Sequence, residues 1–343
     1  MRVLIVLVAG IVQAQMPITN DPINYPNPVQ AAADMLIFFL QNPGNCLQVH
    51  SDIPPEAPSH NMAALWIRGA FHDAGTYDPS NSSDVGGADG SVMDFLELPE
   101  NGGLGPAMAP RFQQKPQIHL SDPDLIALAA QVSVSHCGGP NITTFAPGRV
   151  KADNPTNPVG RLPEGDEDFA TAKKKLLRMG WTNLDIVALV TGSHSMGAVH
   201  KQVSPTITNK TEEFFDDTPG VFDNLIFKKC LSGNCVLPID RGIANDPDLR
   251  PIVERFANDQ DAFFAQYTIS FNKLINNQTT ASLGNPVAAV VKLHENLLSE
   301  GSVPNADTKS VKQPSGAESI HGVWLRLTVA VLIWSGVYSF YQS

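Results

Sequence analysis

Two histidines in this chain stand beside residues that could support proton-transfer or metal chemistry. The first is in the stretch Arg68-Gly-Ala-Phe71-His72-Asp73. Because the preceding residues 63–67 are apolar and favour a helix, we expect Arg68, Phe71 and His72 on one helix face. An imidazole and a permanent cation that face one point can move a proton and stabilise a developing negative charge. An isolated pair of this kind is more often a surface arginine beside a buried histidine, so the rest of the chain must decide.

The second histidine, His194, admits two interpretations. Ser193-His194-Ser195-Met196-Gly197 follows an apolar run and nearly matches the nucleophile elbow of serine hydrolases, with Ser195 as the nucleophile. The first glycine of that motif is missing, and the chain lacks the alternation of strands and helices that the hydrolase fold requires. The other interpretation places His194 and His72 in one site.

The composition bounds the class of protein. The chain has 343 residues, of which 43% are hydrophobic and 17% are charged, which provides ample apolar material for a packed core. The formal net charge of −11 argues against nucleic acid or an anionic membrane as a partner, because both require clusters of Lys and Arg. The sequence therefore predicts a globular protein that acts on a small molecule.

The first residues have the pattern of a secretory signal. Met1-Arg2 precedes an apolar run at 3–12, and Val12-Gln13-Ala14 closes it with a small residue. A membrane-spanning helix is the alternative, but this run is too short for a hydrocarbon layer of roughly 30 Å. We expect residues 1–14 to be a signal peptide and the secreted protein to begin near Gln15.

The opposite end differs in composition from the rest of the chain. Residues 301–326 are polar and include the small triplet Ser315-Gly316-Ala317, whereas residues 327–343 form a hydrophobic tail with an apolar run at 327–341. A small attachment site, a short spacer and a hydrophobic end are typical of a GPI-attachment signal. The alternatives are a tail helix embedded in a membrane and an amphipathic helix packed on the domain. We expect attachment to the cell surface through a GPI lipid.

Four cysteines in a secreted chain predict two disulfides, with three connectivities open. Cys230 and Cys235 enclose a short Leu-Ser-Gly-Asn loop and are expected to pair locally, which leaves Cys46 with Cys137. Four sequons fit a glycosylated secreted protein, and they begin at Asn81, Asn141, Asn209 and Asn277.

Helical periodicity dominates the chain, and alternating strand patterns are scarce. The pattern predicts helices at 31–40, 63–71, 123–134, 170–179, 184–190, 251–256 and 262–274. Asp122 and Asn183 are the expected N-caps of two of them. Long loops rich in Gly, Pro, Asn and Asp separate the helices. We therefore predict one mainly α-helical domain, residues 15–300, with ordered loops that metal ions could hold.

Five motifs together resemble those of the plant and fungal secreted haem peroxidases. They occur in the family's order and approximate spacing, so the set is specific where one motif alone would be weak. The motifs are Arg68-x-x-Phe71-His72-Asp73, Gly86-Gly87-Ala88-Asp89-Gly90-Ser91, Val187-x-Leu189-x-x-Gly192-x-His194-Ser195, Asp216-Asp217-Thr218-Pro219-Gly220-Val221-Phe222-Asp223 and Leu237-Pro238-Ile239-Asp240-Arg241. The resemblance implies a two-part helical fold with haem b between a distal and a proximal helical half.

The resemblance also implies the residues on the proximal side of the haem. His194 would be the axial ligand of the iron, and Asp240 would accept a hydrogen bond from its other ring nitrogen. Phe215 on this side, and Phe71 on the opposite side, would contact the cofactor.

On the distal side, His72 would carry the proton of hydrogen peroxide and Arg68 would stabilise the charge that develops when the O–O bond breaks. Asn101 would accept a hydrogen bond from the far nitrogen of His72 and keep that nitrogen protonated. Glu97 would in turn support Asn101. The alternative for Asn101 is a turn residue ahead of two glycines.

Two calcium ions are implied by the oxygen-rich loops beside the histidines, because calcium takes six to eight oxygen ligands. The distal set would be Asp73, Gly87, Asp89 and Ser91, and the proximal set Ser195, Asp216, Thr218, Val221 and Asp223. Since Asp73 adjoins His72 and Ser195 adjoins His194, each ion would hold the segment that carries a histidine.

Departures from the family patterns narrow the expected reductant. Asn61, Leu65 and His200 stand where manganese peroxidases have carboxylates, so manganese oxidation is not expected. Leu189 replaces the exposed tryptophan of lignin peroxidases, and Phe215 replaces the proximal tryptophan of the intracellular cytochrome-c-type peroxidases. Four cysteines also differ from the eight that are usual in the fungal ligninolytic enzymes.

The sequence thus predicts a monomeric, secreted, fungal class II-like haem peroxidase. It would reduce hydrogen peroxide and oxidise small phenolic reductants in one-electron steps. Two alternatives from other classes are a catalytically silent cell-surface glycoprotein that keeps the fold, and a serine hydrolase that uses Ser195.

Overall fold

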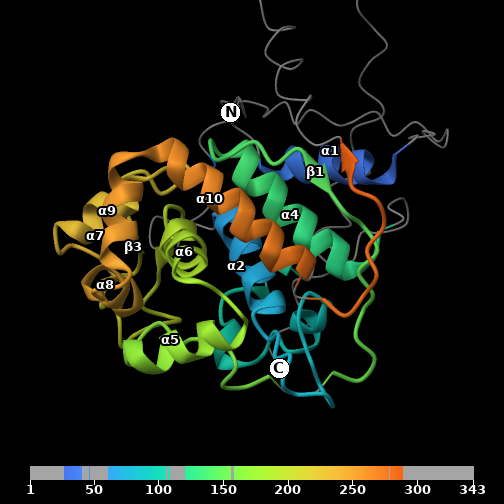
Figure 1. Cartoon of the computed structure of the whole chain (residues 1–343), viewed down its shortest axis with the longest axis horizontal. Coiled ribbons are helices and arrows are strands. Elements are labelled where there is room, and N and C mark those ends of the chain that lie inside the picture. Colours follow the sequence, from blue (N-terminus) through green and yellow to red (C-terminus); the bar gives the residue numbers. More distant parts are fainter. Residues whose placement is uncertain are drawn as a thin grey trace, which may run out of the picture. The chain divides into compact units, whose positions relative to one another are not determined.

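Helices make up most of the regular structure of the chain (Figure 1). The computed structural model describes residues 27–40, 46, 61–105, 107–108, 120–155, 158–277 and 279–288. The α-helices there are α1 (Pro28–Leu40), α2 (Met62–Ala74), α4 (Asp122–His136), α5 (Phe169–Arg178), α6 (Asn183–Ile186), α7 (Leu225–Leu231), α8 (Pro238–Asn245), α9 (Arg250–Asn258) and α10 (Gln260–Asn272). The predicted mainly α-helical fold is confirmed.

The remaining regular structure among the described residues consists of short helical turns and two pairs of short strands. The 3₁₀ turns are η1 (Ser91–Asp94) and η2 (Pro99–Asn101), and the π-helical turns are η3 (Val187–Thr191) and η4 (Lys273–Asn277). Two antiparallel pairs join β1 (Thr144–Phe145) to β4 (Val287–Ala288), with Thr144 opposite Ala288, and β2 (Ala198–Val199) to β3 (Glu213–Phe214), with Ala198 opposite Phe214.

The N-caps of two helices lie one residue upstream of the residues that we expected. Ser121, not Asp122, caps α4, because its hydroxyl accepts from the backbone N–H of Asp124. Thr182, not Asn183, caps α6 in a capping box with Asp185. In both cases a hydroxyl residue one position upstream reaches the free N–H of the third helical residue, which satisfies a group that the helix itself leaves unpaired.

Helices α7 and α8 were not predicted from periodicity. Helix α7 has only seven residues, which is too short for a clear period. Helix α8 contains Gly242, a residue that lowers helix propensity. A Cβ at this position would overlap the ring of Phe169, so the glycine allows α8 to approach the start of α5. Tertiary packing therefore outweighs local propensity in α8.

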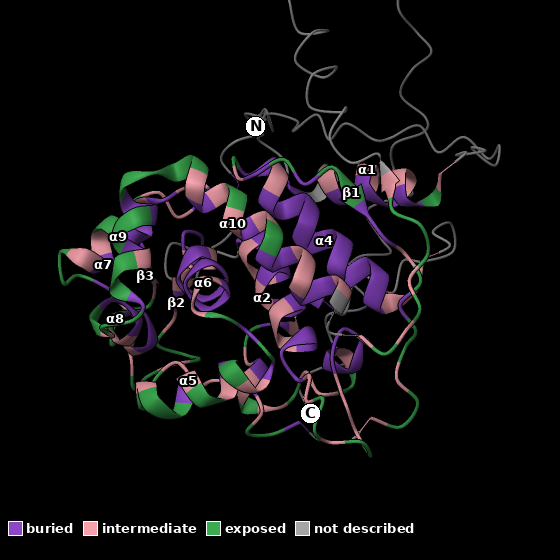
Figure 2. Ribbon diagram, viewed as in Figure 1, coloured by how far each residue is buried: buried purple, intermediate pink, exposed green. Residues whose placement is uncertain are grey.

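Two groups of helices enclose the buried side chains. Helix α2 packs on α1 and α4, while α7, α8 and α9 pack on one another and α10 packs on α9, α6 and η3. Figure 2 shows α4 and α6 as mostly buried and α5 as exposed along much of its length. The ring of Phe222, from the segment before α7, stacks on the ring of Phe263 in α10, with centroids 5.7 Å apart.

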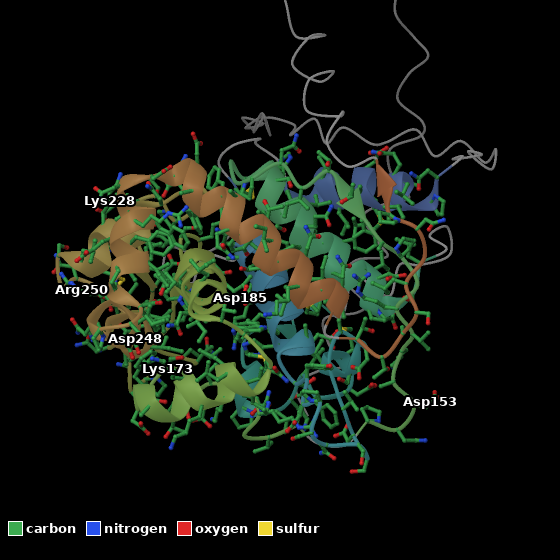
Figure 3. All side chains as sticks on the ribbon, viewed as in Figure 1. Asp153, Lys173, Asp185, Lys228, Asp248 and Arg250 are labelled. Atoms are coloured by element: carbon green, nitrogen blue, oxygen red, sulfur yellow. A yellow bond between two sulfur atoms is a disulfide. The ribbon has the colours of Figure 1, made fainter. Side chains whose placement is uncertain are left out.

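Two disulfides and a pair of ionic contacts link parts of the chain. The structure contains the disulfides Cys46–Cys137 and Cys230–Cys235, the pairing expected above. Lys173 of α5 pairs with Asp246, at 2.7 Å, and lies 3.9 Å from Asp248 (Figure 3). These ion pairs tie α5 to the segment that follows α8.

The expected signal peptide, residues 1–14, and the expected tail, residues 301–343, lie outside the described residues. The described residues all belong to one compact unit, residues 1–300. Within them, no helix combines the length and the apolar character that crossing a membrane requires.

Candidate active site

Helix α2 presents Arg68 and His72, and the turn η2 supplies their partners. The Nδ1 atom of His72 lies 2.8 Å from Oδ1 of Asn101, while Nδ2 of Asn101 donates to the carbonyl of Phe95 at 2.8 Å. Because the amide nitrogen of Asn101 is committed to Phe95, its oxygen faces His72, and His72 must be the donor at Nδ1. The Nε2 atom of His72 therefore keeps its lone pair and can accept a proton.

The same turn fixes the arginine. Nη1 of Arg68 donates to the carbonyl of Gly102 at 2.7 Å, and Nη2 donates to the carbonyl of Glu100 at 2.8 Å. Asn101, between these two carbonyls, is only 2% exposed. One turn thus positions both the imidazole and the guanidinium, and the other N–H groups of Arg68 remain available to a ligand.

The expected support of Asn101 by Glu97 is wrong. Glu97 is exposed, and the Phe95 carbonyl accepts the amide hydrogen bond instead. The turn folds back so tightly that a backbone group six residues upstream reaches Asn101, and no side chain is needed.

The electrostatics of this pair suit a neutral base beside a cation. Loss of hydration lowers the pKa of His72 to about 3, and the positive charge of Arg68 acts in the same direction, whereas the hydrogen bond to Asn101 opposes them. Burial lowers the pKa of Arg68 to about 10. At neutral pH His72 is therefore uncharged and Arg68 is positively charged.

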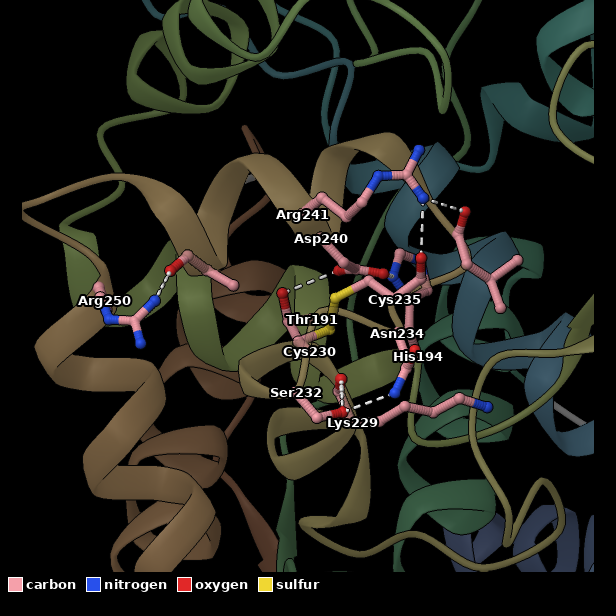
Figure 4. Close-up of a disulfide and its surroundings, with 12 residues drawn as sticks. Thr191, His194, Lys229, Cys230, Ser232, Asn234, Cys235, Asp240, Arg241 and Arg250 are labelled. Atoms are coloured by element: carbon pink, nitrogen blue, oxygen red, sulfur yellow. Dashed lines mark hydrogen bonds and ion pairs between the residues drawn. A yellow bond between two sulfur atoms is a disulfide. The ribbon is translucent and has the colours of Figure 1, made fainter.

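His194 follows the π-helical turn η3 and pairs with Asp240 of α8. The Nδ1 atom of His194 lies 2.9 Å from Oδ2 of Asp240, and the hydroxyl of Thr191 donates to Oδ1 of the same carboxylate at 2.8 Å. Figure 4 shows these residues beside the Cys230–Cys235 disulfide. The ring of Phe215 lies 5.0 Å from the His194 ring, centroid to centroid. Asp240 is 1% exposed, so its charge acts in a nearly dry environment.

These donors fit a haem group. Since Asp240 receives the Nδ1 proton of His194, the Nε2 lone pair of this ring is free for a metal, and the side chain is 26% exposed. His72 likewise leaves Nε2 free. An imidazole ligand with a carboxylate behind it, and a second imidazole that is held by an amide, match what a haem iron with an open face requires.

The predicted distal calcium residues lie in one loop beside α2. Asp73, at the end of α2, accepts from the backbone N–H groups of Gly90 and Val92, and Asp89 accepts from the N–H of Ser91. The N–H of Gly87 donates to Thr76, whose hydroxyl returns to the carbonyl of Asp73. Burial and the nearby charge of Asp89 raise the pKa of Asp73 to about 8. A buried carboxylate and a half-buried one that repel each other would be stabilised by a cation between them.

The predicted proximal set contains two buried oxygens without a hydrogen-bond partner, Oγ of Ser195 and Oδ2 of Asp216. The hydroxyl of Thr218 donates to Asp223 at 2.9 Å, and the N–H of Val221 donates to the carbonyl of Thr218. Burial raises the pKa of Asp216 to about 7, with Asp223 a further cause. Buried polar atoms almost always have a hydrogen-bond or metal partner, so these two unpaired oxygen atoms point to a cation or other ligand that would contact them.

The donors of both predicted sets are oxygen atoms. In the part of the chain that the structure describes, no three His, Cys, Asp or Glu side chains gather as a metal group. Each predicted set has two carboxylates, and its other members would contribute hydroxyl or backbone carbonyl oxygens, which are ligands of hard cations.

The geometry argues against the serine hydrolase interpretation. Ser195 is fully buried, and its hydroxyl has no hydrogen-bond partner among the described residues. A serine nucleophile needs an adjacent base to remove its proton. The neighbouring histidine, His194, makes no hydrogen bond with the Ser195 hydroxyl, so no base is in place to remove its proton.

Of the three positions compared with manganese peroxidases, Asn61 caps α2 and donates to the carbonyl of Pro219. His200 pairs with Glu212 at 3.1 Å, a carboxylate that we had not considered from the sequence. Sequence reasoning also missed Thr191, although it lies three residues before His194.

Comparison with known proteins agrees with this geometry. The model of the family described as Peroxidase matches residues 50–259. L-ascorbate peroxidase 5, peroxisomal, from Arabidopsis thaliana is 38% identical over 223 residues, which cover 63% of this chain and 76% of that protein. L-ascorbate peroxidase 2, cytosolic, from Oryza sativa subsp. japonica is 36% identical over 222 residues, which cover 62% of this chain and 84% of that protein.

The chain therefore belongs to the peroxidase family, within the plant and fungal haem peroxidase superfamily. It is an enzyme that reduces hydrogen peroxide.

Proposed function

We propose that the protein is a secreted haem peroxidase, similar to the fungal class II enzymes, that oxidises small phenolic reductants one electron at a time. The observation that carries the proposal is the pair of oriented imidazoles. His72 and His194 each donate from Nδ1 to a fixed acceptor, which leaves both Nε2 atoms with a free lone pair.

His194 would hold haem b through Nε2, and the cofactor would supply the redox-active iron at which peroxide is reduced. Nε2 of His72 accepts a proton from hydrogen peroxide and returns it to the departing oxygen, which leaves as water. Arg68 is positively charged and offers its remaining N–H groups to the negative charge that develops on that oxygen. Asn101 keeps the proton on Nδ1 of His72, so the same nitrogen acts as base and then as acid throughout.

An exposed apolar side chain near the turn η2 supports the proposal of a phenolic reductant. Val203 is 43% exposed, and its Cγ2 lies 3.7 Å from the position of a Cβ on Gly103, with Nη1 of Arg68 4.0 Å from the same point. An aromatic ring can pack against such a side chain, whereas the relatives named above are ascorbate peroxidases. Oxidation of a phenol should therefore be compared with oxidation of ascorbate.

Two calcium ions belong to this proposal. Asp73, Gly87, Asp89 and Ser91 would hold one, and Ser195, Asp216, Thr218, Val221 and Asp223 the other. The unpaired oxygens of Ser195 and Asp216 and the raised pKa of Asp73 support these sets.

Secretion is supported by the two disulfides, because such bonds persist in oxidising compartments. For the tail we propose GPI attachment, on the pattern of residues 301–343. The mature protein, from near Gln15 onward, would act as a glycosylated monomer at the cell surface.

The proposal is tested by purifying the haem-supplied protein and recording its absorption spectrum and its peroxide-dependent oxidation of a methoxyphenol, ascorbate and Mn²⁺. We expect a Soret band and oxidation of the phenol. Oxidation of ascorbate without oxidation of the phenol would reject the phenolic reductant but leave the peroxidase chemistry intact. A folded protein without a Soret band would reject His194 as the ligand.

A further inference from the structure

Both oxygens of the Asp240 carboxylate are engaged. Oδ2 accepts from His194 at 2.9 Å, and Oδ1 accepts from the hydroxyl of Thr191 at 2.8 Å. Asp240 is 1% exposed and Thr191 is fully buried, so water does not compete for either contact. A carboxylate without a proton can only accept, and the Thr191 hydroxyl is therefore the donor.

Thr191 reaches Asp240 from the last position of the π-helical turn η3. Such a turn is wider than an α-helical turn and often occurs at a functional site. The backbone after it is held closely: a Cβ on Gly192 would lie 2.5 Å from Cε2 of Phe263, and Ser193 shares a hydrogen bond with the hydroxyl of Tyr267 at 3.0 Å. The hydroxyl of Thr191 is therefore presented to Asp240 by a fixed backbone (Figure 4).

We propose that Thr191 is a positioning residue that sets how strongly His194 donates to the haem iron. The proposal rests on ligation of the iron by His194. A carboxylate that receives two hydrogen bonds has less charge available for each, so the Thr191 hydroxyl draws negative charge away from the His194 contact. His194 then keeps more of its Nδ1 proton and is a weaker donor than Asp240 alone would make it.

The direction of the effect follows from this competition. In Thr191→Val, which keeps the shape but removes the hydroxyl, the charge of Asp240 acts on His194 alone. The ring becomes more basic and stabilises ferric over ferrous iron. At a fixed potential we expect the ratio of ferrous to ferric enzyme to fall by about tenfold, the same order as the smaller losses of metal affinity or activity that follow removal of a partner of a metal ligand. The iron–histidine stretching frequency of the ferrous enzyme should rise.

The experiment compares wild type, Thr191→Val and Thr191→Ser as haem-loaded proteins, by spectroelectrochemical titration and resonance Raman spectroscopy. Thr191→Ser retains a hydroxyl and should stay close to wild type in both readouts. Equal potentials and frequencies in wild type and Thr191→Val would overturn the proposal. It would also fail if Thr191→Ser shifted as far as Thr191→Val, because packing of the methyl group would then be the cause.

A measurement on the wild type keeps the test independent of how the variants fold. The Thr191 hydroxyl proton should be protected from exchange with water and visible by NMR, and rapid exchange of this proton would reject the inference. Wild-type protein that folds without binding haem would instead reject the proposed function, and the two failures are thus distinguishable.

Discussion

The two histidines of the site differ most in the group that accepts their Nδ1 proton. His72 faces the neutral amide oxygen of Asn101, whereas His194 faces the carboxylate of Asp240. A neutral acceptor orients an imidazole without making it much more basic, and a buried carboxylate raises the electron density of the ring. This difference supports our proposal that His72 transfers the proton and that His194 binds the metal.

Substitution of each histidine should therefore give a different defect. His72→Ala should keep haem but react with peroxide about 10²- to 10⁴-fold more slowly, because it removes the acid and base. His72→Gln can still contact Asn101 but cannot exchange a proton, and should be as slow. His194→Ala should lose or misligate the haem. Spectra and rapid-mixing kinetics check all three, and the reverse pattern would show that the two roles are exchanged.

The pH dependence of the reaction with peroxide should be set by the low pKa of His72. Because burial and Arg68 hold this pKa at about 3, the base stays unprotonated in mildly acidic solution. The rate of reaction with peroxide should be flat from neutral pH downward and fall only as the pH approaches that value.

In Asn101→Asp, a negative acceptor favours the imidazolium, so the acid limb of the pH–rate profile should move to higher pH. Stopped-flow kinetics across the pH range measure the limb. A limb that stayed in place, or moved to lower pH, would contradict the assignment of His72 as the base.

Residue types and spacing were enough to bring the main partners of the site together. Arg68 and His72 fell on one helix, and the predicted contacts of His72 with Asn101 and of His194 with Asp240 are present in the structure. The sequence could not show that a backbone carbonyl supports Asn101, because carbonyl groups carry no residue signature. It could not show the contact of Thr191 either, since this depends on the width of a π-helical turn.

At the scale of elements, loops hold the helices that carry the chemistry. Asp73, the residue after His72, lies in the last turn of α2 and accepts hydrogen bonds from the backbone of Gly90 and Val92. Ser195 lies one residue after His194. Any ion in either oxygen set would therefore act on the position of a histidine.

Removal of calcium should lower stability, most strongly at alkaline pH. In the metal-free protein the pKa of Asp73 is about 8 and that of Asp216 about 7, against a usual value of 3.8. Between the usual pKa of 3.8 and these raised pKa values, the folded state binds more protons than the unfolded state. The stability of the metal-free protein therefore falls as the pH rises through this window. Calcium displaces these protons and removes the loss.

Thermal unfolding with and without a strong chelator, at about pH 5 and about pH 8, tests this linkage. We expect the larger loss at the higher pH, and a chelated haem enzyme that becomes low-spin as His72 drifts toward the iron. Asp248→Asn, at a largely exposed carboxylate outside both sets, is the control and should lose as much stability to the chelator as the wild type does. Unchanged melting after verified removal of calcium would reject both sites.

Periodicity predicted helices to within a few residues wherever the apolar face was long. It failed at α7 and α8, where a short length and Gly242 remove the local signal and packing supplies the stability. The caps of α4 and α6 were displaced by one residue, because several polar residues near each start could cap and only the backbone geometry selects one of them.

At the scale of the whole molecule, one buried arginine is held by partners from several segments of the compact unit. Arg149 is fully buried, donates to Asp124 at 2.8 Å and also contacts the carbonyls of Ala146 and Ile275. Removal of either partner would leave an uncompensated buried charge, which costs about 3–5 kcal/mol. Arg149 thus links Asp124 of α4 to the turn η4, which follows α10.

The tail carries a prediction about location. Because residues 327–341 are apolar and follow a polar spacer with a small triplet, the mature enzyme should be held on the outer surface by a GPI lipid. A phosphatidylinositol-specific phospholipase should then release active peroxidase from intact cells. Secreted protein whose mass includes an intact C-terminus at Ser343 would exclude this processing.

The Cys46–Cys137 disulfide joins cysteines 91 positions apart and so closes a large covalent ring of chain that includes α2 and the turn η2. A single protease cut anywhere between these cysteines would open the ring without releasing a fragment. Nicked enzyme would migrate as one species in a denaturing gel and as two only after reduction. If the enzyme is secreted, as we propose, the segment that carries Arg68 and His72 would thus stay covalently attached to the rest of the protein after such a cut.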